Sequence, residues 1–137
     1  ILNYYSRGGI YAIELRENKK CIGCVDIRID EENDKLTFGY ILNRNYWNKG
    51  YMTEVLNEIL RFSFEVLKIN RVEAEHYVVN GASGKVMQKC KMKHEGRGIQ
   101  EVKVKGKYYD VDHYAMLKSE WLEINQNELN EIIPNTD

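Results

Sequence analysis

The spacing of apolar residues changes within the first half of the chain, and this change constrains the fold more than any other feature. Residues 35–42 are apolar at every second position, which is typical of a strand with one buried face. Residues 51–67 carry apolar side chains at intervals of three and four, which predicts a helix. Residues 71–79 are again rich in strand-forming side chains. A strand–helix–strand unit of this kind predicts a right-handed crossover with two parallel strands.

The other periodic segments predict one mixed α/β domain around this unit. The expected strands are residues 10–16, 21–29, 35–42, 71–79, 99–105 and 108–117, and the expected helices are residues 51–67, 83–91 and 119–131. The first three strands should form an antiparallel meander, because short charged turns separate them. Ligands of such sheets bind beyond the carboxyl ends of parallel strands, so residues 43–53 and 80–84 are the expected binding loops.

The charge balance and composition exclude several classes of partner. The chain has 20 Lys and Arg against 21 Asp and Glu, a net charge of -1, so it lacks the basic field that nucleic acid requires. The longest apolar run is far shorter than a membrane span, and residues 1–10 do not form a signal peptide. Three cysteines, a low and odd number, indicate a reducing compartment. We therefore expect a cytoplasmic monomer or homodimer without nucleic-acid or membrane partners.

Two of the cysteines, Cys21 and Cys24, form a C-x-x-C pattern. The surrounding residues alternate as in a strand, where positions i and i+3 point to opposite faces, so the two thiols cannot bind one ion together. A zinc site would also need a second pair of ligands. We expect two packed thiols and no metal.

The loop at 43–53 combines features of an anion site. Gly50 allows a tight turn into the following helix, whose first amides have no partner within the helix. Free amides and the positive end of a helix suit a pyrophosphate, and Arg44 and Lys49 add positive charge. Alone this pattern is weak, because a single glycine before a helix is more often an ordinary turn.

The residues around this loop resemble a known family. They are Phe38-Gly39-Tyr40, then Tyr46-Trp47-Asn48-Lys49-Gly50-Tyr51-Met52-Thr53-Glu54, Asn80 and Ser83, Lys89, Lys93-His94-Glu95-Gly96, Tyr108-Tyr109-Asp110, Tyr114-Ala115-Met116-Leu117 and Glu120-Trp121. In this order and spacing, over residues 11–121, the pattern is similar to the GNAT N-acetyltransferase superfamily. It is most similar to the branch that acetylates the N-termini of ribosomal proteins.

The resemblance implies a mixed, mostly antiparallel sheet that is splayed between two parallel strands and flanked by helices. The family's N-terminal strand and helices have no counterpart here, and residues 1–9 resemble their tail. The chain also begins with Ile1 rather than Met, so we expect it to be part of a longer native chain. We treat residues 1–137 as a single acetyltransferase domain that ends, at 122–137, in a helix and a frayed tail.

The resemblance also implies a set of acetyl-CoA-binding residues. These are Ile41, Leu42, Trp47, Asn48, Lys49, Gly50, Tyr51, Met52, Thr53, Asn80 and Ser83. The backbone around Ile41 and Leu42 would pair with pantetheine, and the amides of residues 48–53 would hold the pyrophosphate. Asn80 and Ser83 would lie near the thioester.

Several positions depart from the family pattern. Met52 replaces the usual Ala or Gly of the loop, which predicts tighter packing against the phosphates, and Lys91 and Met92 replace a usual Gly-Phe. Some N-terminal acetyltransferases have a catalytic Glu five residues before the Asn, where Glu75 stands here. They also have a Tyr acid seven residues after the Asn, where this chain has Met87.

Transfer of an acetyl group to an amine needs a base for the amine and a donor for the departing thiolate. Glu75 is the candidate base, with a solvated or salt-bridged strand carboxylate as the alternative. Ser83 is the candidate partner of the thiolate, and it would also suit a helix N-cap. His76 fits a satisfied core histidine better than a second base, and Cys90 fits packing better than an acyl-enzyme.

The sequence thus predicts an acetyl-CoA-dependent N-acetyltransferase that transfers the acetyl group directly to an amine, above all to a peptide α-amine. Two alternatives stay open. The first is acetylation of a small amine, such as a polyamine or an aminoglycoside, which an acidic acceptor pocket would favour. The second is a catalytically silent acyl-CoA-binding module, which Met87 would favour.

Overall fold

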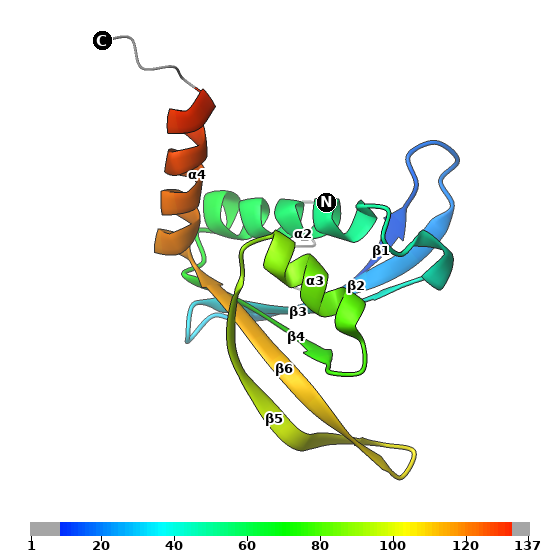
Figure 1. Cartoon of the computed structure of the whole chain (residues 1–137). Helices are drawn as coiled ribbons and strands as arrows, with labels where there is room; N and C mark the ends of the chain where they lie inside the picture. Colours follow the sequence, from blue (N-terminus) through cyan, green and yellow to red (C-terminus); the bar gives the residue numbers. More distant parts are fainter. Residues whose placement is uncertain (1–8, 133–137) are drawn as a thin grey trace.

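The computed structural model describes residues 9–132, with side chains described for residues 9–128. Six strands form one sheet in the order β1-β2-β3-β4-β6-β5 (Figure 1). The strands are β1 (Gly9–Glu14), β2 (Cys21–Asp30), β3 (Lys35–Leu42), β4 (Arg71–Tyr77), β5 (Lys93–Val104) and β6 (Lys107–Leu117). The helical segments are η1 (Arg44–Tyr46), α2 (Tyr51–Arg61), η2 (Phe62–Val66), α3 (Gly81–Lys89) and α4 (Lys118–Ile132). The expected tails at residues 1–8 and 133–137 lie outside the described residues.

β3 and β4 are the two parallel strands, and they pair over about half of their length. The ladder runs from Lys35 opposite Arg71 to Phe38 opposite Ala74, whereas β3 continues to Leu42 and β4 to Tyr77. The other neighbouring strands are antiparallel. The expected mixed sheet, open between two parallel strands, is therefore confirmed.

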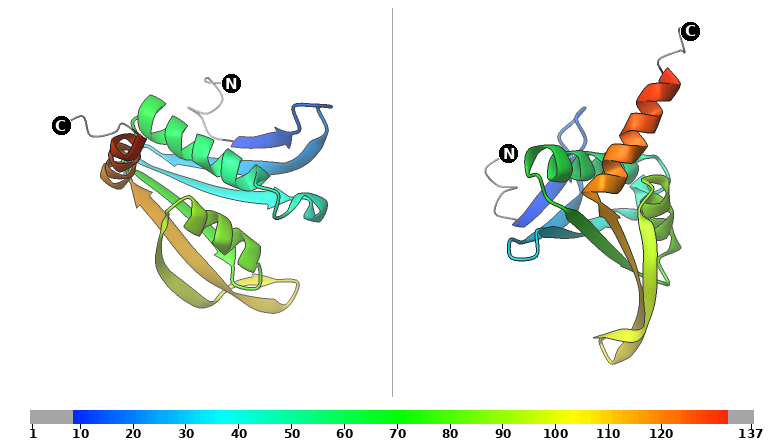
Figure 2. Two further views of the ribbon diagram at one scale, coloured as in Figure 1. Left: turned by 45° about the horizontal axis from the view of Figure 1, so that its top comes forward. Right: turned by 90° about the vertical axis from the view of Figure 1, so that its left-hand side faces the viewer.

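Helices α2 and α3 pack on one face of this sheet (Figure 2). α2 buries Leu56 and Ile59, and α3 buries Met87. These side chains join one apolar cluster with Phe38 of β3 and Val72 of β4. Each fully buried side chain of this size stabilises the fold by about 1.5–3 kcal/mol, so the cluster fixes both helices relative to the sheet opening. Within residues 9–132 no helix is long and apolar enough to cross a membrane.

The helix expected at 51–67 has the expected length but changes geometry. It is α-helical to Arg61 and continues as a π-helical turn, η2. In that turn the amide of Leu67 donates to the carbonyl of Phe62, five residues earlier, at 3.0 Å. Phe64 is buried in the turn and contacts the ring of Trp121 in α4, with 5.7 Å between ring centres. The wider turn therefore anchors α4 to the core.

The hairpin of β5 and β6 is longer than the sequence indicated. β5 begins at Lys93 rather than at residue 99. Residues 93–98 are polar and contain two glycines, so they show no alternation, yet they pair with β6. The register shifts between His94 and Gly96 and again between Gly98 and Val102, which marks two bulges. The hairpin extends well beyond the helices in Figure 1.

The start of α3 also differs from the expectation. α3 begins at Gly81, with Asn80 at the N-cap position, and β4 ends at Tyr77 rather than at residue 79. Ser83 therefore lies within the helix, and the alternative role of Ser83 as N-cap is wrong. The other boundaries lie within two residues of those expected.

Cys21 and Cys24 are not both packed. Cys21 is exposed and Cys24 is half-buried, which corrects the expectation of two packed thiols. The pairing of β2 with β1 shifts register at this place, and both Ile22 and Val25 are buried. Strict alternation is lost at such a bulge, so a rule based on alternation does not place Cys21.

The glycines of β2 and β3 give a test of the sheet at its opening. A Cβ added at Gly23 would overlap the carbonyl oxygen of Ile41 in the neighbouring strand, whereas one added at Gly39 would meet no atom within 4 Å. We expect Gly23→Ala to lower the free energy of unfolding by about 3 kcal/mol. Gly39→Ala, the control, should change it by less than about 1 kcal/mol. Urea denaturation measures both, and equal effects would contradict this packing.

Candidate active site

A cavity of about 150 Å³ lies where β3 and β4 separate, between the loop after β3 and the starts of α2 and α3. Ten of the eleven residues expected to bind acetyl-CoA line it, namely Ile41, Leu42, Trp47, Asn48, Gly50, Tyr51, Met52, Thr53, Asn80 and Ser83. Lys49, the eleventh, belongs to the same loop but is not one of the lining residues. The two loops singled out in the sequence therefore meet at one cavity.

The loop between β3 and α2 presents backbone amides at this cavity. Asn48 and Gly50 have positive φ angles of 60° and 84°, a conformation that glycine adopts freely and asparagine tolerates. Gly50 precedes α2 without a side-chain cap. The amide of Glu54 donates to the carbonyl of Gly50 at 3.1 Å, so the amides of residues 51–53 are the ones without a partner inside the helix. The Trp47 indole donates to the carbonyl of Leu42 at 2.8 Å and holds the loop against the end of β3. This geometry suits a phosphate or pyrophosphate.

Positive side chains surround the same cavity. Lys85 and Lys89 of α3 line it. Arg44 and Lys49 lie in the loop, each over an aromatic ring at 5.4 and 5.6 Å from the ring centre. Sequence reasoning did not assign Lys85 to the site. Its spacing of four from Lys89, on one face of the second helix, is the signal that could have found it.

The start of α3 forms the other wall of the cavity. Ser83 is 6% exposed, and its carbonyl accepts a hydrogen bond from the Tyr40 hydroxyl at 3.4 Å. This contact joins β3 to α3 where the ladder between β3 and β4 has ended. Burial raises the pKa of Tyr40, which keeps its hydroxyl a donor. Met87, at the family's Tyr position, is fully buried and has no proton to give.

Two residues near the cavity serve packing. Met52 belongs to the hydrophobic core and also lines the cavity. Tighter packing of this side chain against the phosphates stays a prediction. Cys90 is buried, and its thiol lies 3.7 Å from the carbonyl oxygen of Thr53 in α2. Burial raises the pKa of Cys90 to about 11, which makes it a poor nucleophile. The expected packing role of Cys90 is confirmed.

Glu75, the candidate base, lies on the other face of the sheet. It follows Ala74, the buried residue with which the β3–β4 ladder ends, and successive side chains of a strand alternate between faces. Its side chain is 46% exposed, and one carboxylate oxygen lies 3.5 Å from Nδ1 of His113. Glu75 lines a second cavity, so the structure does not bring it into one cavity with Ser83. The two residues lie on either side of the sheet opening.

The second cavity is also lined by a network of paired charges. Arg71 donates to Glu73 at 2.8 Å and to Glu95 at 3.1 Å, and Lys35 lies 3.4 Å from Glu73. The hydrogen bonds from Arg71 hold the pKa of Glu95 below its usual range. Burial favours the neutral form of Glu73, but Arg71 and Lys35 outweigh it and lower the pKa of Glu73. These two carboxylates are thus occupied, whereas Glu75 stands outside the network.

His76 is buried under α3, as expected, but it is not satisfied. Its side chain is 6% exposed, and Nδ1–H donates to the carbonyl of Tyr77 at 2.7 Å. Nε2 has no hydrogen-bond partner and lies 3.8 Å from a carboxylate oxygen of Asp112. The expectation of a satisfied core histidine is therefore wrong for this atom.

Asp112, beside His76, keeps its negative charge in the interior. Arg97 donates to it through two nitrogens at 2.8 and 3.1 Å, and His94 lies at 3.0 Å. The hydrogen bonds from Arg97 hold the pKa of Asp112 well below its usual range. The buried carboxylate of β6 thus binds two side chains of β5 and lies close to His76 of β4.

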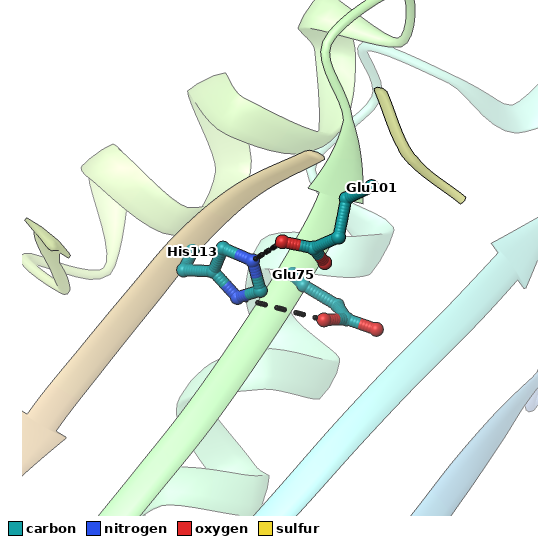
Figure 3. Close-up of side chains that lie close together, drawn as sticks. All are labelled: Glu75, Glu101 and His113. Atoms are coloured by element: carbon teal, nitrogen blue, oxygen red, sulfur yellow. Dashed lines mark hydrogen bonds and ion pairs between the residues drawn. The ribbon is translucent and has the colours of Figure 1, made fainter. Parts of the chain in front are cut away.

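Among the described residues, one group of three side chains could hold a metal ion, namely Glu75, Glu101 and His113, with ligand atoms within 4.8 Å of one another (Figure 3). Glu101 lies 2.7 Å from Nε2 of His113, whereas Glu75 faces Nδ1. A metal ion takes a single ring nitrogen. Because the carboxylates approach different nitrogens, the arrangement favours hydrogen bonding over coordination.

Comparison with known proteins identifies the family. Residues 2–93 match the family described as acetyltransferase (GNAT) domain. The chain is 33% identical to an uncharacterized N-acetyltransferase p20 of Bacillus licheniformis over 112 residues. The aligned region covers 81% of this chain and 63% of that protein. It is 29% identical over 119 residues to a putative ribosomal N-acetyltransferase YdaF of Bacillus subtilis, and this region covers 86% of this chain and 64% of that protein.

Relatives with a different named acceptor share the same fold. A spermidine N(1)-acetyltransferase of Vibrio cholerae is 27% identical over 105 residues, covering 76% of this chain and 61% of that protein. A solved mutant structure of the spermidine N-acetyltransferase SpeG from that organism matches with a TM-score of 0.76 at 22% identity. The match covers 90% of this chain and 73% of that chain. The chain belongs to the acetyltransferase (GNAT) domain family. It spans less than two thirds of the length of these curated relatives.

The contact between α3 and His76 can be tested with two glycines of the same helix. A Cβ added at Gly84 would lie 2.9 Å from Nε2 of His76, whereas one added at Gly81 would meet nothing within 4 Å. Alanine normally stabilises a helix relative to glycine by about 1 kcal/mol. We expect Gly84→Ala to destabilise the protein by about 1–2 kcal/mol instead, and Gly81→Ala not to.

A double-mutant cycle with His76→Ala, followed by chemical denaturation, separates this contact from other effects. Gly84→Ala should cost less in the His76→Ala background, because the obstructing ring is gone. An equal cost in both backgrounds would show that the His76 ring does not limit the space at residue 84.

Proposed function

We propose that this chain forms the acetyl-CoA-binding and catalytic part of an N-acetyltransferase. The observation that carries the proposal is the convergence of ten expected binding residues on one cavity at the opening of the sheet. Membership in the GNAT domain family supports it. Acetyl-CoA is the proposed cosubstrate, and no step requires a metal.

The backbone of β3 offers the binding edge for pantetheine. Beyond Phe38 this edge has no ladder partner in β4, and unpaired backbone groups favour a ligand that carries amides. Ile41 is exposed and Leu42 half-buried at this edge. The pyrophosphate would then meet the amides of residues 48–53, with Lys85 and Lys89 nearby.

The reaction is a direct transfer. The nitrogen of the acceptor amine attacks the thioester carbonyl carbon, the C–S bond breaks, and the nitrogen loses a proton. Glu75 takes this proton, either directly or through water, because it lies beside the opening on the face opposite the cofactor cavity. The thiolate leaves on the cofactor side, where Ser83 lies. Positioning across the opening contributes the rest of the rate.

The proposed acceptor is a peptide α-amine. Such an amine is partly neutral near pH 7, so a carboxylate base of modest strength is sufficient. The similarity to the putative ribosomal N-acetyltransferase supports this choice. A small polyamine is the second candidate, supported by the similarity to the spermidine enzyme and by the carboxylate of Glu75 in the second cavity.

We place the protein in the cytoplasm. Cys21, Cys24 and Cys90 are free thiols, which suits a reducing compartment.

The proposal is tested by following thiol release from acetyl-CoA with three acceptors: a peptide with a free α-amine, the same peptide with a blocked N-terminus, and spermidine. We expect transfer to the free peptide alone. Glu75→Gln should lower kcat about 100-fold, because the variant cannot accept the proton, while the Kd for acetyl-CoA stays unchanged. Glu73→Gln, on the same face of β4, is the matched control and should keep kcat within a few-fold.

Each acceptor result has a distinct meaning. Transfer to spermidine and not to the peptide would assign the small-amine alternative. Acetyl-CoA binding without transfer to any acceptor would favour a silent acyl-CoA-binding module. An unchanged kcat in Glu75→Gln would remove Glu75 from the mechanism.

A further inference from the structure

The imidazole of His113 is held between two carboxylates from neighbouring strands (Figure 3). Nε2 lies 2.7 Å from Glu101 of β5, and Nδ1 lies 3.5 Å from Glu75 of β4. His113 stands on β6, the strand between them. Both of its ring nitrogens therefore face an acidic group, and one of these groups is the proposed base.

The sheet builds this arrangement from two features. The antiparallel register of β4 and β6 places Glu75 directly opposite His113. The bulge of β5 between Gly98 and Val102 then brings Glu101 to the other side of the ring.

The bulge leaves room for the Glu101 carboxylate. A Cβ added at Gly98 would overlap the carboxylate of Glu101, so the absent side chain at Gly98 provides this space. The amide of Gln100, which has a positive φ angle of 50°, donates to Asp110 at 2.7 Å and fixes the bulge. The position of Glu101 is therefore set by the backbone of β5.

The charges around His113 divide into two sets. Glu73 and Glu95, which line the same cavity, are both bound by Arg71. In the described part of the chain, no arginine or lysine forms an ion pair with Glu75 or Glu101. His113 is thus the side chain that lies within ion-pair distance of both carboxylates.

The two distances define how the ring can act. A carboxylate only accepts hydrogen bonds, so the short contact of 2.7 Å requires a proton on Nε2, donated to Glu101. In the neutral ring this leaves a lone pair on Nδ1, which lies 3.5 Å from a carboxylate oxygen of Glu75. Such a lone pair can accept a proton from Glu75 once Glu75 has been protonated. A carboxylate that fixes the tautomer of a histidine is the arrangement that makes histidine an effective proton acceptor.

We propose that His113, oriented by Glu101, takes from Glu75 the proton that the acceptor amine loses. The inference rests on the proposed function and adds two positioning residues that act through Glu75. The proton moves from the amine nitrogen to Glu75, and then from Glu75 to Nδ1 of His113. Glu75 is restored as a carboxylate, the imidazolium is stabilised by Glu101, and solvent removes the proton after product release.

His113→Gln is the decisive variant, because the glutamine amide can still donate to Glu101 but cannot accept a proton. We expect kcat to fall about 10- to 100-fold with KM unchanged. The pH dependence of kcat should also change, because His113→Gln removes the group that receives the proton from Glu75. His94→Gln is the matched control: His94 is similarly exposed and binds a carboxylate, Asp112, at 3.0 Å. It should leave kcat and the pH profile unchanged.

Gly98→Ala and Glu101→Gln test the orienting role. The first should move the Glu101 carboxylate away from His113, and the second should remove its charge. Both should lower kcat about 10-fold, and neither should lower it further when combined with His113→Gln.

The outcomes separate this inference from the proposed function. If wild-type protein transfers acetyl groups and His113→Gln does so at the same rate, His113 takes no proton and the inference is overturned while the function stands. A purely structural role would give a loss in His113→Ala that His113→Gln restores, which also overturns it. If wild-type protein binds acetyl-CoA but transfers to no amine, both proposals fail.

A measurement that does not depend on activity is the ¹H–¹⁵N correlation spectrum of the imidazoles. We expect the neutral His113 ring to carry its proton on Nε2, and Glu101→Gln or Gly98→Ala to change this tautomer population. A proton on Nδ1 in the neutral ring would overturn the inference.

Discussion

The early end of the ladder between β3 and β4 is the constraint on which the rest of the site depends. After Phe38 and Ala74 the two parallel strands no longer pair, so backbone groups of both strands are left at the opening. Such groups must find other partners. A hydrogen bond from the Tyr40 hydroxyl to the Ser83 carbonyl joins β3 to α3 beside the opening. The opening is therefore held by helix packing and remains accessible to a ligand that carries amides.

The opening separates two environments of opposite charge. On the helix-covered face, the amides after Gly50 and the side chains of Lys85 and Lys89 favour a polyanion. On the other face, the Glu75 carboxylate stands outside the ion pairs of Arg71 and favours a positively charged amine. An acetyl thioester held at the opening would meet the amine from the opposite side. Glu75 and Ser83 line different cavities. Direct transfer across the sheet would require this separation, with the base on one side of the opening and the partner of the thiolate on the other.

The sequence allowed the strand–helix–strand unit and most residues that line the cavity between β3, α2 and α3 to be predicted, because these depend on local periodicity and on a contiguous loop motif. The beginning of β5 could not be predicted, since residues 93–98 owe their strand conformation to pairing with β6. The exposure of Cys21 follows from a bulge that alternation does not reveal. The grouping of Glu75, Glu101 and His113 arises from register and a second bulge, which no pattern in one sequence encodes.

The most direct test of the account is a thermal melt of this chain with and without acetyl-CoA. Ligand at a hundred times its Kd should stabilise the folded state by about 2.7 kcal/mol, which gives a clear upward shift of Tm. S-acetyl-pantetheine, which lacks the pyrophosphate, should give a much smaller shift at the same concentration, because the amides after Gly50 then have no anion to bind. No shift with acetyl-CoA at millimolar concentration would contradict the assignment of the cavity between β3, α2 and α3.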